Sequence, residues 1–215
     1  MLYLVERGAP SNPAVVFVHG GGLGSRSWEP VIERLPDFFC LAPDLPGQGR
    51  SSDLTFTLEG SARAIGEIVE ARVPSGRAHV VGLSLGGAVV LTLLRVAPQV
   101  VDHAIISGSS GRVPGWLVEV SRPLLAMARL MKPAWMVELT IRQLGIPREY
   151  HGLVRNDLLV GSRPAFLQSL FHELTILEPP RSIDRFSWSS AARSLEANGS
   201  TDGSRSGRCG NILPR

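Results

Sequence analysis

The sequence predicts an α/β fold: a mostly parallel sheet, flanked by helices, with a helical cap insertion. Two observations support this prediction. Short, continuous apolar runs alternate with amphipathic segments of helical length over residues 1–110. Continuous apolar runs are typical of strands that a parallel sheet buries on both faces. Alternation of strands and helices at these lengths is typical of βαβ units, which build such a sheet.

Each expected element follows from its own residues. Strands are expected at 2–6, 14–20, 38–44, 77–84 and 101–108, and helices at 27–35, 57–73 and 85–97. The helix at 27–35 should have one apolar face, formed by Trp28, Val31, Ile32 and Leu35. The helix at 57–73 should bury a similar face, formed by Leu58, Ala62, Ile65, Ile68 and Val69. The Gly- and Pro-rich residues between 45 and 53 are expected to form a loop.

The chain divides into three segments. A core is expected at 1–110 and a helical cap insertion at 111–180, where the apolar residues keep a helical period. Prolines divide this insertion into several short helices. Its large side chains either line an apolar pocket or form the insertion's own core, and both interpretations stay open; these side chains are Trp116, Met127, Met131, Trp135 and Met136.

The composition changes after Pro180. Val occurs twenty times in residues 1–180 and is absent from residues 181–215, which contain eight Ser, six Arg and four Gly. So little apolar surface does not offset the entropy lost on ordering, and we expect disorder from about residue 190 onward. Two explanations stay open, a naturally disordered tail and a shifted reading frame. With either explanation, the C-terminal strands of the sheet are expected to be absent.

Composition and charge argue against several classes of protein. The 215 residues are 44% hydrophobic, and no apolar run has the length of a membrane span. Residues 1–180 carry 16 basic and 16 acidic residues, so the net charge of +3 comes from the tail and is weak support for nucleic-acid binding. Cys40 and Cys209 are too few for a disulfide framework or a cysteine zinc site. We expect a cytoplasmic globular protein with no metal, no cofactor, no nucleic acid and no membrane partner.

The strongest motif is G-L-S-L-G at residues 82–86, between the expected strand at 77–84 and the expected helix at 85–97. In this context G-x-S-x-G predicts a nucleophile held in a tight, strained turn. The glycines are needed because side chains there would collide with the neighbouring strand and helix. The helix N-terminus also places N–H groups and partial positive charge beside the serine. We therefore interpret Ser84 as a nucleophile.

Two further motifs follow expected strands at the same edge of the sheet. H-G-G-G at residues 19–22 supplies backbone N–H groups, which together with that of Leu85 can stabilise a developing oxyanion. Neither G-K-[ST] nor a complete G-x-G-x-x-G is present, which argues against a nucleotide site. His19 is interpreted as a structural hydrogen-bonding residue. Asp44 begins the motif D-L-P-G-Q-G-R-S and is expected to brace its loop.

In this order and spacing, the three motifs resemble those of the α/β-hydrolase family over roughly residues 12–110. The resemblance implies that Ser84 is the nucleophile, that the N–H groups of Leu85 and of Gly21 or Gly22 form an oxyanion hole, and that the helical insertion is the family's cap. Serine at this position implies esterase, thioesterase or carbon–carbon bond hydrolase chemistry. The implied partner is a small apolar acyl substrate.

The base and the acid that a serine nucleophile requires are not evident in the sequence. The resemblance places both after the serine, with the histidine near the C-terminus, whereas the last histidine here is His172. A base carried by the insertion is the alternative: His172 or His151, with Glu173 or Asp157 as its orienting acid.

Three functions therefore stay open. The first is a serine hydrolase impaired by loss of its acid and histidine, and the second is a working esterase with a base from the insertion. The third is a non-catalytic ligand-binding protein on the same fold. His79 is expected at the far end of its strand from Ser84, and His103 inside its strand, so neither is a candidate base.

Overall fold

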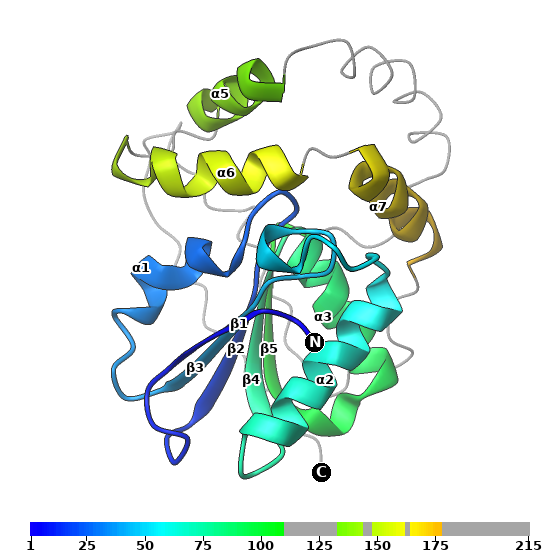
Figure 1. Cartoon of the computed structure of the whole chain (residues 1–215). Coiled ribbons are helices and arrows are strands. Elements are labelled where there is room, and N and C mark those ends of the chain that lie inside the picture. Colours follow the sequence, from blue (N-terminus) through cyan, green and yellow to red (C-terminus); the bar gives the residue numbers. More distant parts are fainter. Residues whose placement is uncertain (110–132, 144–147, 162–163, 178–215) are drawn as a thin grey trace, which may run out of the picture.

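The computed structural model describes residues 1–109, 133–143, 148–161 and 164–177 (Figure 1). Its strands form one sheet in the order β1-β3-β2-β4-β5. Neighbouring strands are parallel, except that β1 runs antiparallel to β3. The predicted α/β fold with a mostly parallel sheet is confirmed. The strands are β1 (Leu4–Arg7), β2 (Ala14–Val18), β3 (Phe39–Pro43), β4 (Ala78–Leu83) and β5 (Val101–Ser107).

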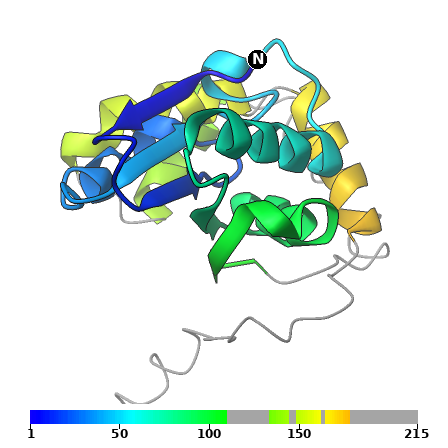
Figure 2. The same cartoon turned by 90° about the horizontal axis from the view of Figure 1, so that it is seen from below.

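Helices cover both faces of this sheet and one of its ends (Figures 1 and 2). α2 and α3 lie on one face and α1 on the other, while α5, α6 and α7 lie over the carboxyl ends of the parallel strands. In the part of the chain that the structure describes, no helix is both long enough and apolar enough to cross a membrane. The helices are α1 (Glu29–Ile32), α2 (Leu58–Arg72), α3 (Leu85–Val96), α5 (Pro133–Gln143), α6 (His151–Gly161) and α7 (Pro164–Ile176). The 3-10 turns are η1 (Ser25–Trp28), η2 (Gly49–Ser51), η3 (Pro98–Val100) and η4 (Arg148–Tyr150).

The central strand β2 contributes to two hydrophobic cores. Val16 and Val18 pack with α2 and α3 in the larger core. Val15 and Phe17 pack with Ile32 of α1 in the smaller core on the opposite face. Because successive side chains of a strand point to opposite faces, every residue of β2 must be apolar to fill both cores. This explains the continuous apolar sequence of the strand.

The helix expected at 27–35 is shorter in the structure. It begins as a 3-10 turn, and α1 then starts with Pro30 in its first turn. Proline fits the start of a helix but has no N–H to continue an earlier one. Ile32 is buried and Trp28 packs beside it, but Val31 is 39% exposed. The prediction that Val31 joins the apolar face is therefore wrong.

Part of the predicted insertion and all of the predicted tail lie outside the described residues. Trp116, Met127 and Met131 of the predicted insertion lie outside the described residues. The segment 181–215, for which disorder or a shifted reading frame is expected, also lies outside them. Within them, Val137 and Ile141 of α5 form a small core with Val154 of α6. Trp135 is 54% exposed and does not belong to that core.

β5 forms one edge of the sheet in the described part of the chain. Ile105 of this strand is 61% exposed, whereas its neighbours Ala104 and Ile106 pack against the larger core. An exposed apolar side chain on an edge strand favours pairing with another chain, because the edge also presents unpaired backbone groups.

We expect Ile105→Lys to slow aggregation on heating, because a charge on an edge strand opposes strand pairing. The free energy of unfolding should change by less than about 0.5 kcal/mol, as for most exposed positions. Ile106→Lys is the matched control, since it places the same charge against the core and should lower the melting temperature. Light scattering and circular dichroism measure the two effects. Equal aggregation rates in Ile105→Lys and the unsubstituted chain would show that β5 is not the aggregating edge.

Candidate active site

The turn between β4 and α3 holds Ser84 in a strained backbone conformation. Its φ is 52° and its ψ is −113°, and no other non-glycine residue in the described ranges has a positive φ. Such a conformation costs about 1–3 kcal/mol and persists only where the surrounding structure imposes it. Here β4 and α3 fix the two ends of the turn. The turn leaves Ser84 exposed at the carboxyl edge of the sheet.

Two glycines make this turn possible. A Cβ atom on Gly82 would lie 2.5 Å from the carbonyl oxygen of Gly86, and a Cβ atom on Gly86 would collide with the carbonyl groups of Val18 and His19 at the end of β2. The first turn of α3 therefore packs directly on the backbone that leaves β2. This places the N–H of Leu85, which has no acceptor within the helix, at the carboxyl edge of the sheet.

The glycine-rich loop after β2 lies against this turn. A Cβ atom on Gly21 would lie 3.6 Å from Cδ2 of Leu85. The N–H of Gly22 donates to Oε1 of Gln48 at 2.6 Å in the interior, whereas the N–H of Gly21 has no acceptor among the described residues. Both glycines were expected to donate to an oxyanion. The N–H of Gly21 is available for this, whereas the N–H of Gly22 is already hydrogen-bonded to Gln48.

His19 is buried among the three loops that surround the turn. Its Nε2 accepts a hydrogen bond from the N–H of Leu45 at 2.9 Å, so Nδ1 carries the proton and donates to the carbonyl oxygen of Gly20 at 2.8 Å. Burial lowers the pKa of the imidazole and keeps it neutral. With both ring nitrogens engaged, His19 has no lone pair for the proton of Ser84, in agreement with its interpretation as a structural residue.

Asp44 holds two loops together. Its Oδ1 accepts the N–H of Ser25 at 2.6 Å, and its Oδ2 accepts the N–H of Arg50 at 2.8 Å. These bonds match the bracing role expected for Asp44. Gln48 ties this loop to Gly22, a role that was not predicted from the sequence and whose only signal there is the glutamine in D-L-P-G-Q-G.

Asp157 of α6 faces Asp44 across Gly24. A Cβ atom on Gly24 would lie 2.8 Å from Oδ2 of Asp157 and 3.2 Å from Oδ1 of Asp44. Burial, and then the charge of Asp44, raise the pKa of Asp157 to about 6, although Arg26, Arg50 and the N–H of Gly24 act in the opposite direction. Asp157 therefore contacts the core loops, and no histidine of the described residues pairs with it.

α7 does not bring its predicted base to the nucleophile. Leu170 faces the glycine loop, since its Cδ2 would lie 3.9 Å from a Cβ atom on Gly21. His172 lies about 200° further around the helix and is exposed. Glu173 accepts the N–H of Leu58 at 2.6 Å, at the first turn of α2, and so holds α7 against α2.

No histidine in the described ranges is hydrogen-bonded to Ser84. His79 and His103 lie in the amino-terminal halves of β4 and β5, at the opposite end of the sheet. His151 is the first residue of α6. The structure therefore brings together the predicted nucleophile and the N–H groups of Gly21 and Leu85, without a base from the described part of the chain.

A protein-family model described as "Alpha/beta hydrolase family" matches residues 15–201, which is most of the chain. The chain belongs to the alpha/beta hydrolase family. The mostly parallel sheet flanked by helices agrees with the fold expected from the sequence motifs of this α/β-hydrolase.

Curated relatives of this α/β-hydrolase include enzymes named as esterases. An esterase of Mycobacterium tuberculosis is 34% identical over 99 residues, which cover 45% of this chain and 33% of the relative. A pimeloyl (acyl-carrier protein) methyl ester esterase of Pectobacterium carotovorum is 39% identical over 110 residues, covering 51% of this chain and 41% of the relative. The chain spans only about a third of the length of several curated relatives that it matches, between 32% and 36% for three of them.

Solved structures share the fold of this α/β-hydrolase. An esterase of Thermogutta terrifontis superposes with a TM-score of 0.69 at 21% identity, covering 83% of this chain and 68% of that one. The enol-lactonase of Burkholderia xenovorans superposes with a TM-score of 0.67 at 17% identity, covering 82% of this chain and 70% of that one. At these identities, the superpositions support the fold alone.

We expect Asp157→Asn to stabilise the folded chain at pH 7.5. Because the pKa of Asp157 is raised from 3.8 to about 6 on folding, the folded chain binds the proton more tightly, and the free energy of unfolding falls as the pH rises from 4 to 7. Asparagine keeps an oxygen for the N–H of Gly24 but carries no charge. The gain at pH 7.5 should be about 1–2 kcal/mol, since the side chain is only partly buried.

Urea unfolding of both chains at pH 4.5 and pH 7.5 measures this difference. The gain should fall to about one third at pH 4.5, where Asp157 is protonated in the folded chain but still largely ionised in the unfolded chain. Asp53→Asn removes an exposed carboxylate and is the matched control. An equal gain at both pH values would contradict a raised pKa at Asp157.

Proposed function

We propose that the chain is a serine hydrolase that cleaves an ester or thioester through an acyl-enzyme on Ser84. The observation that carries this proposal is the strained conformation of Ser84 at the first turn of α3. A backbone that costs free energy is retained where it positions a reacting group. The relatives named as esterases support the same bond type.

The proposed reaction begins when Oγ of Ser84 attacks the carbonyl carbon of the substrate. The Oγ–carbon bond forms, and the carbonyl oxygen takes up negative charge. The N–H groups of Gly21 and Leu85 would stabilise that charge; removing one such donor typically costs about 2.7–4 kcal/mol in other enzymes. The carbonyl group then re-forms, and the bond from its carbon to the leaving oxygen or sulfur breaks. The proton that Ser84 gives up passes to water, water supplies a proton to the departing alcohol or thiol, and the acyl group stays on Ser84.

The surroundings of the glycine loop favour an apolar acyl group. Leu170 of α7 and Leu85 of α3 approach Gly21, and Leu158 of α6 would lie 3.1 Å from a Cβ atom on Gly22. These side chains come from helices that lie over the carboxyl ends of the strands, where a cap would contact substrate (Figure 1). We propose that α5, α6 and α7 form this cap.

We also propose that turnover is impaired. A serine hydroxyl is a weak nucleophile unless a base removes its proton, and water needs the same help to hydrolyse the acyl-enzyme. None of the described histidines reaches Ser84, so both steps should be slow, and hydrolysis of the acyl-enzyme should be the slower one. A ligand-binding protein on the same fold is the alternative.

We expect the full chain to release close to one equivalent of p-nitrophenol from p-nitrophenyl butyrate, followed by slow turnover. Mass spectrometry of the intact chain should detect one butyryl group, and Ser84→Ala should abolish both signals. Ser75→Ala, which removes an exposed serine in the turn before β4, is the matched control. The same release from Ser84→Ala would contradict the proposed nucleophile. Binding without acylation would support the ligand-binding alternative, and fast sustained turnover would contradict the impairment.

A further inference from the structure

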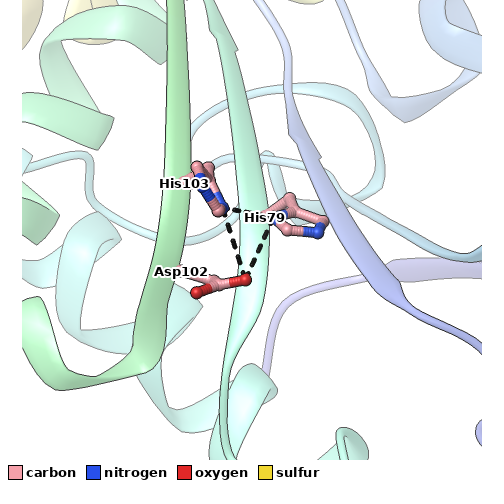
Figure 3. Close-up of side chains that lie close together, drawn as sticks. All are labelled: His79, Asp102 and His103. Atoms are coloured by element: carbon pink, nitrogen blue, oxygen red, sulfur yellow. Dashed lines mark hydrogen bonds and ion pairs between the residues drawn. The ribbon is translucent and has the colours of Figure 1, made fainter. Parts of the chain in front are cut away.

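Three side chains that commonly bind metals meet on strands β4 and β5, at the opposite end of the sheet from Ser84. They are His79, Asp102 and His103 (Figure 3). All three lie on the face of the sheet opposite α2 and α3. They take no part in the proposed hydrolysis.

A β-bulge brings these side chains together. The strand ladder pairs Ala78 with Val101 and Val80 with Ala104, so one residue of β4 stands opposite two adjacent residues of β5. In a regular strand, two adjacent side chains point to opposite faces, but a bulge turns both to the same side. Burial agrees with this: Val101 and Ala104, three positions apart, both pack against the larger core. The two residues between them, Asp102 and His103, therefore both point away from that core.

The distances between the three candidate ligand atoms match those of a tetrahedral zinc site. Nδ1 of His79 and Nδ1 of His103 are 3.2 Å apart, and they lie 3.5 Å and 3.3 Å, respectively, from Oδ2 of Asp102. Ligands about 2.0–2.1 Å from a tetrahedral metal are separated by roughly 3.3–3.4 Å. One ion can therefore reach all three atoms with little movement of the side chains.

The neighbouring residue Arg77 orients the carboxylate of Asp102 for binding a metal ion. The guanidinium of Arg77 lies 3.6 Å from its other oxygen, Oδ1, and also donates to the carbonyl oxygen of Val101 at 3.0 Å. This arrangement holds the carboxylate with Oδ2 toward the two rings, as groups around a metal site commonly do. The side chain of His103 is 75% exposed, so water can complete the coordination.

We propose that His79, Asp102 and His103 form a site for one divalent transition-metal ion, with zinc as the best fit. Two imidazoles and one carboxylate suit zinc and its neighbours, whereas magnesium and calcium prefer oxygen ligands alone. His79 precedes Ser84 by five residues along an extended strand, so about 16 Å separates the site from the nucleophile. The ion would join the edge strand β5 to β4 and would not contact the substrate.

The test is a titration of the full chain with zinc against a chromophoric chelator, in a Cys209→Ser background that removes the thiol outside the described residues. We expect one zinc ion per chain. His79→Ala and His103→Ala should each weaken binding at least about 100-fold, since even the loss of a group behind a ligand costs 10–100-fold. His172→Ala, which removes an exposed histidine of α7, is the matched control and should bind zinc unchanged.

Thermal melting provides a second readout, because an ion that binds only the folded chain raises the melting temperature. Zinc should raise it for the Cys209→Ser chain and for His172→Ala but not for His103→Ala, and magnesium should have no effect. Ser84→Ala should bind zinc with unchanged affinity, so failure of the hydrolysis experiment leaves this proposal standing. Zinc binding that is weak in the Cys209→Ser chain, or equal in all variants, would overturn it.

Discussion

The first turn of α3 lies directly on the backbone that leaves β2, and the geometry of the candidate site depends on this contact. Any side chain at Gly86 would separate helix from strand, because the carbonyl groups of Val18 and His19 occupy that space. The contact fixes the start of α3, which in turn fixes the strained turn at Ser84 and the N–H of Leu85. The site is therefore a product of backbone packing between two elements, and its precision does not require the side chains of α5, α6 and α7.

A buried polar network holds the loops around that contact. Asp44 binds the backbone of two loops, His19 joins the end of β2 to the loop after β3, and Gln48 holds Gly22. Buried polar groups are costly unless they are hydrogen-bonded, so these bonds oppose any movement of one loop without the others. The glycine loop is thereby held in place by hydrogen bonds within the chain itself.

The strands, α2, α3 and the strained turn at Ser84 could be predicted because their signals are local. An apolar run, a helical period and a glycine pattern each depend on neighbouring residues. Two features could not be predicted in this way. The contact between Asp157 and Asp44 joins residues far apart in the chain, and the bulge in β5 depends on its pairing with β4. The exposure of His172 could have been predicted from the sequence, because the helical period places it on a different face of α7 from Leu170.

The bulge also bears on how such a surface can change during evolution. Beyond the bulge, β5 resumes its register with β4, from Val80–Ala104 to Leu83–Ser107. Deleting one of the two bulged residues would restore a regular ladder and leave every core-facing side chain of the strand in place. A single-codon insertion or deletion can therefore add or remove one outward side chain without repacking the interior. In a strand paired on both sides, the same insertion would have to be accommodated by a second neighbour.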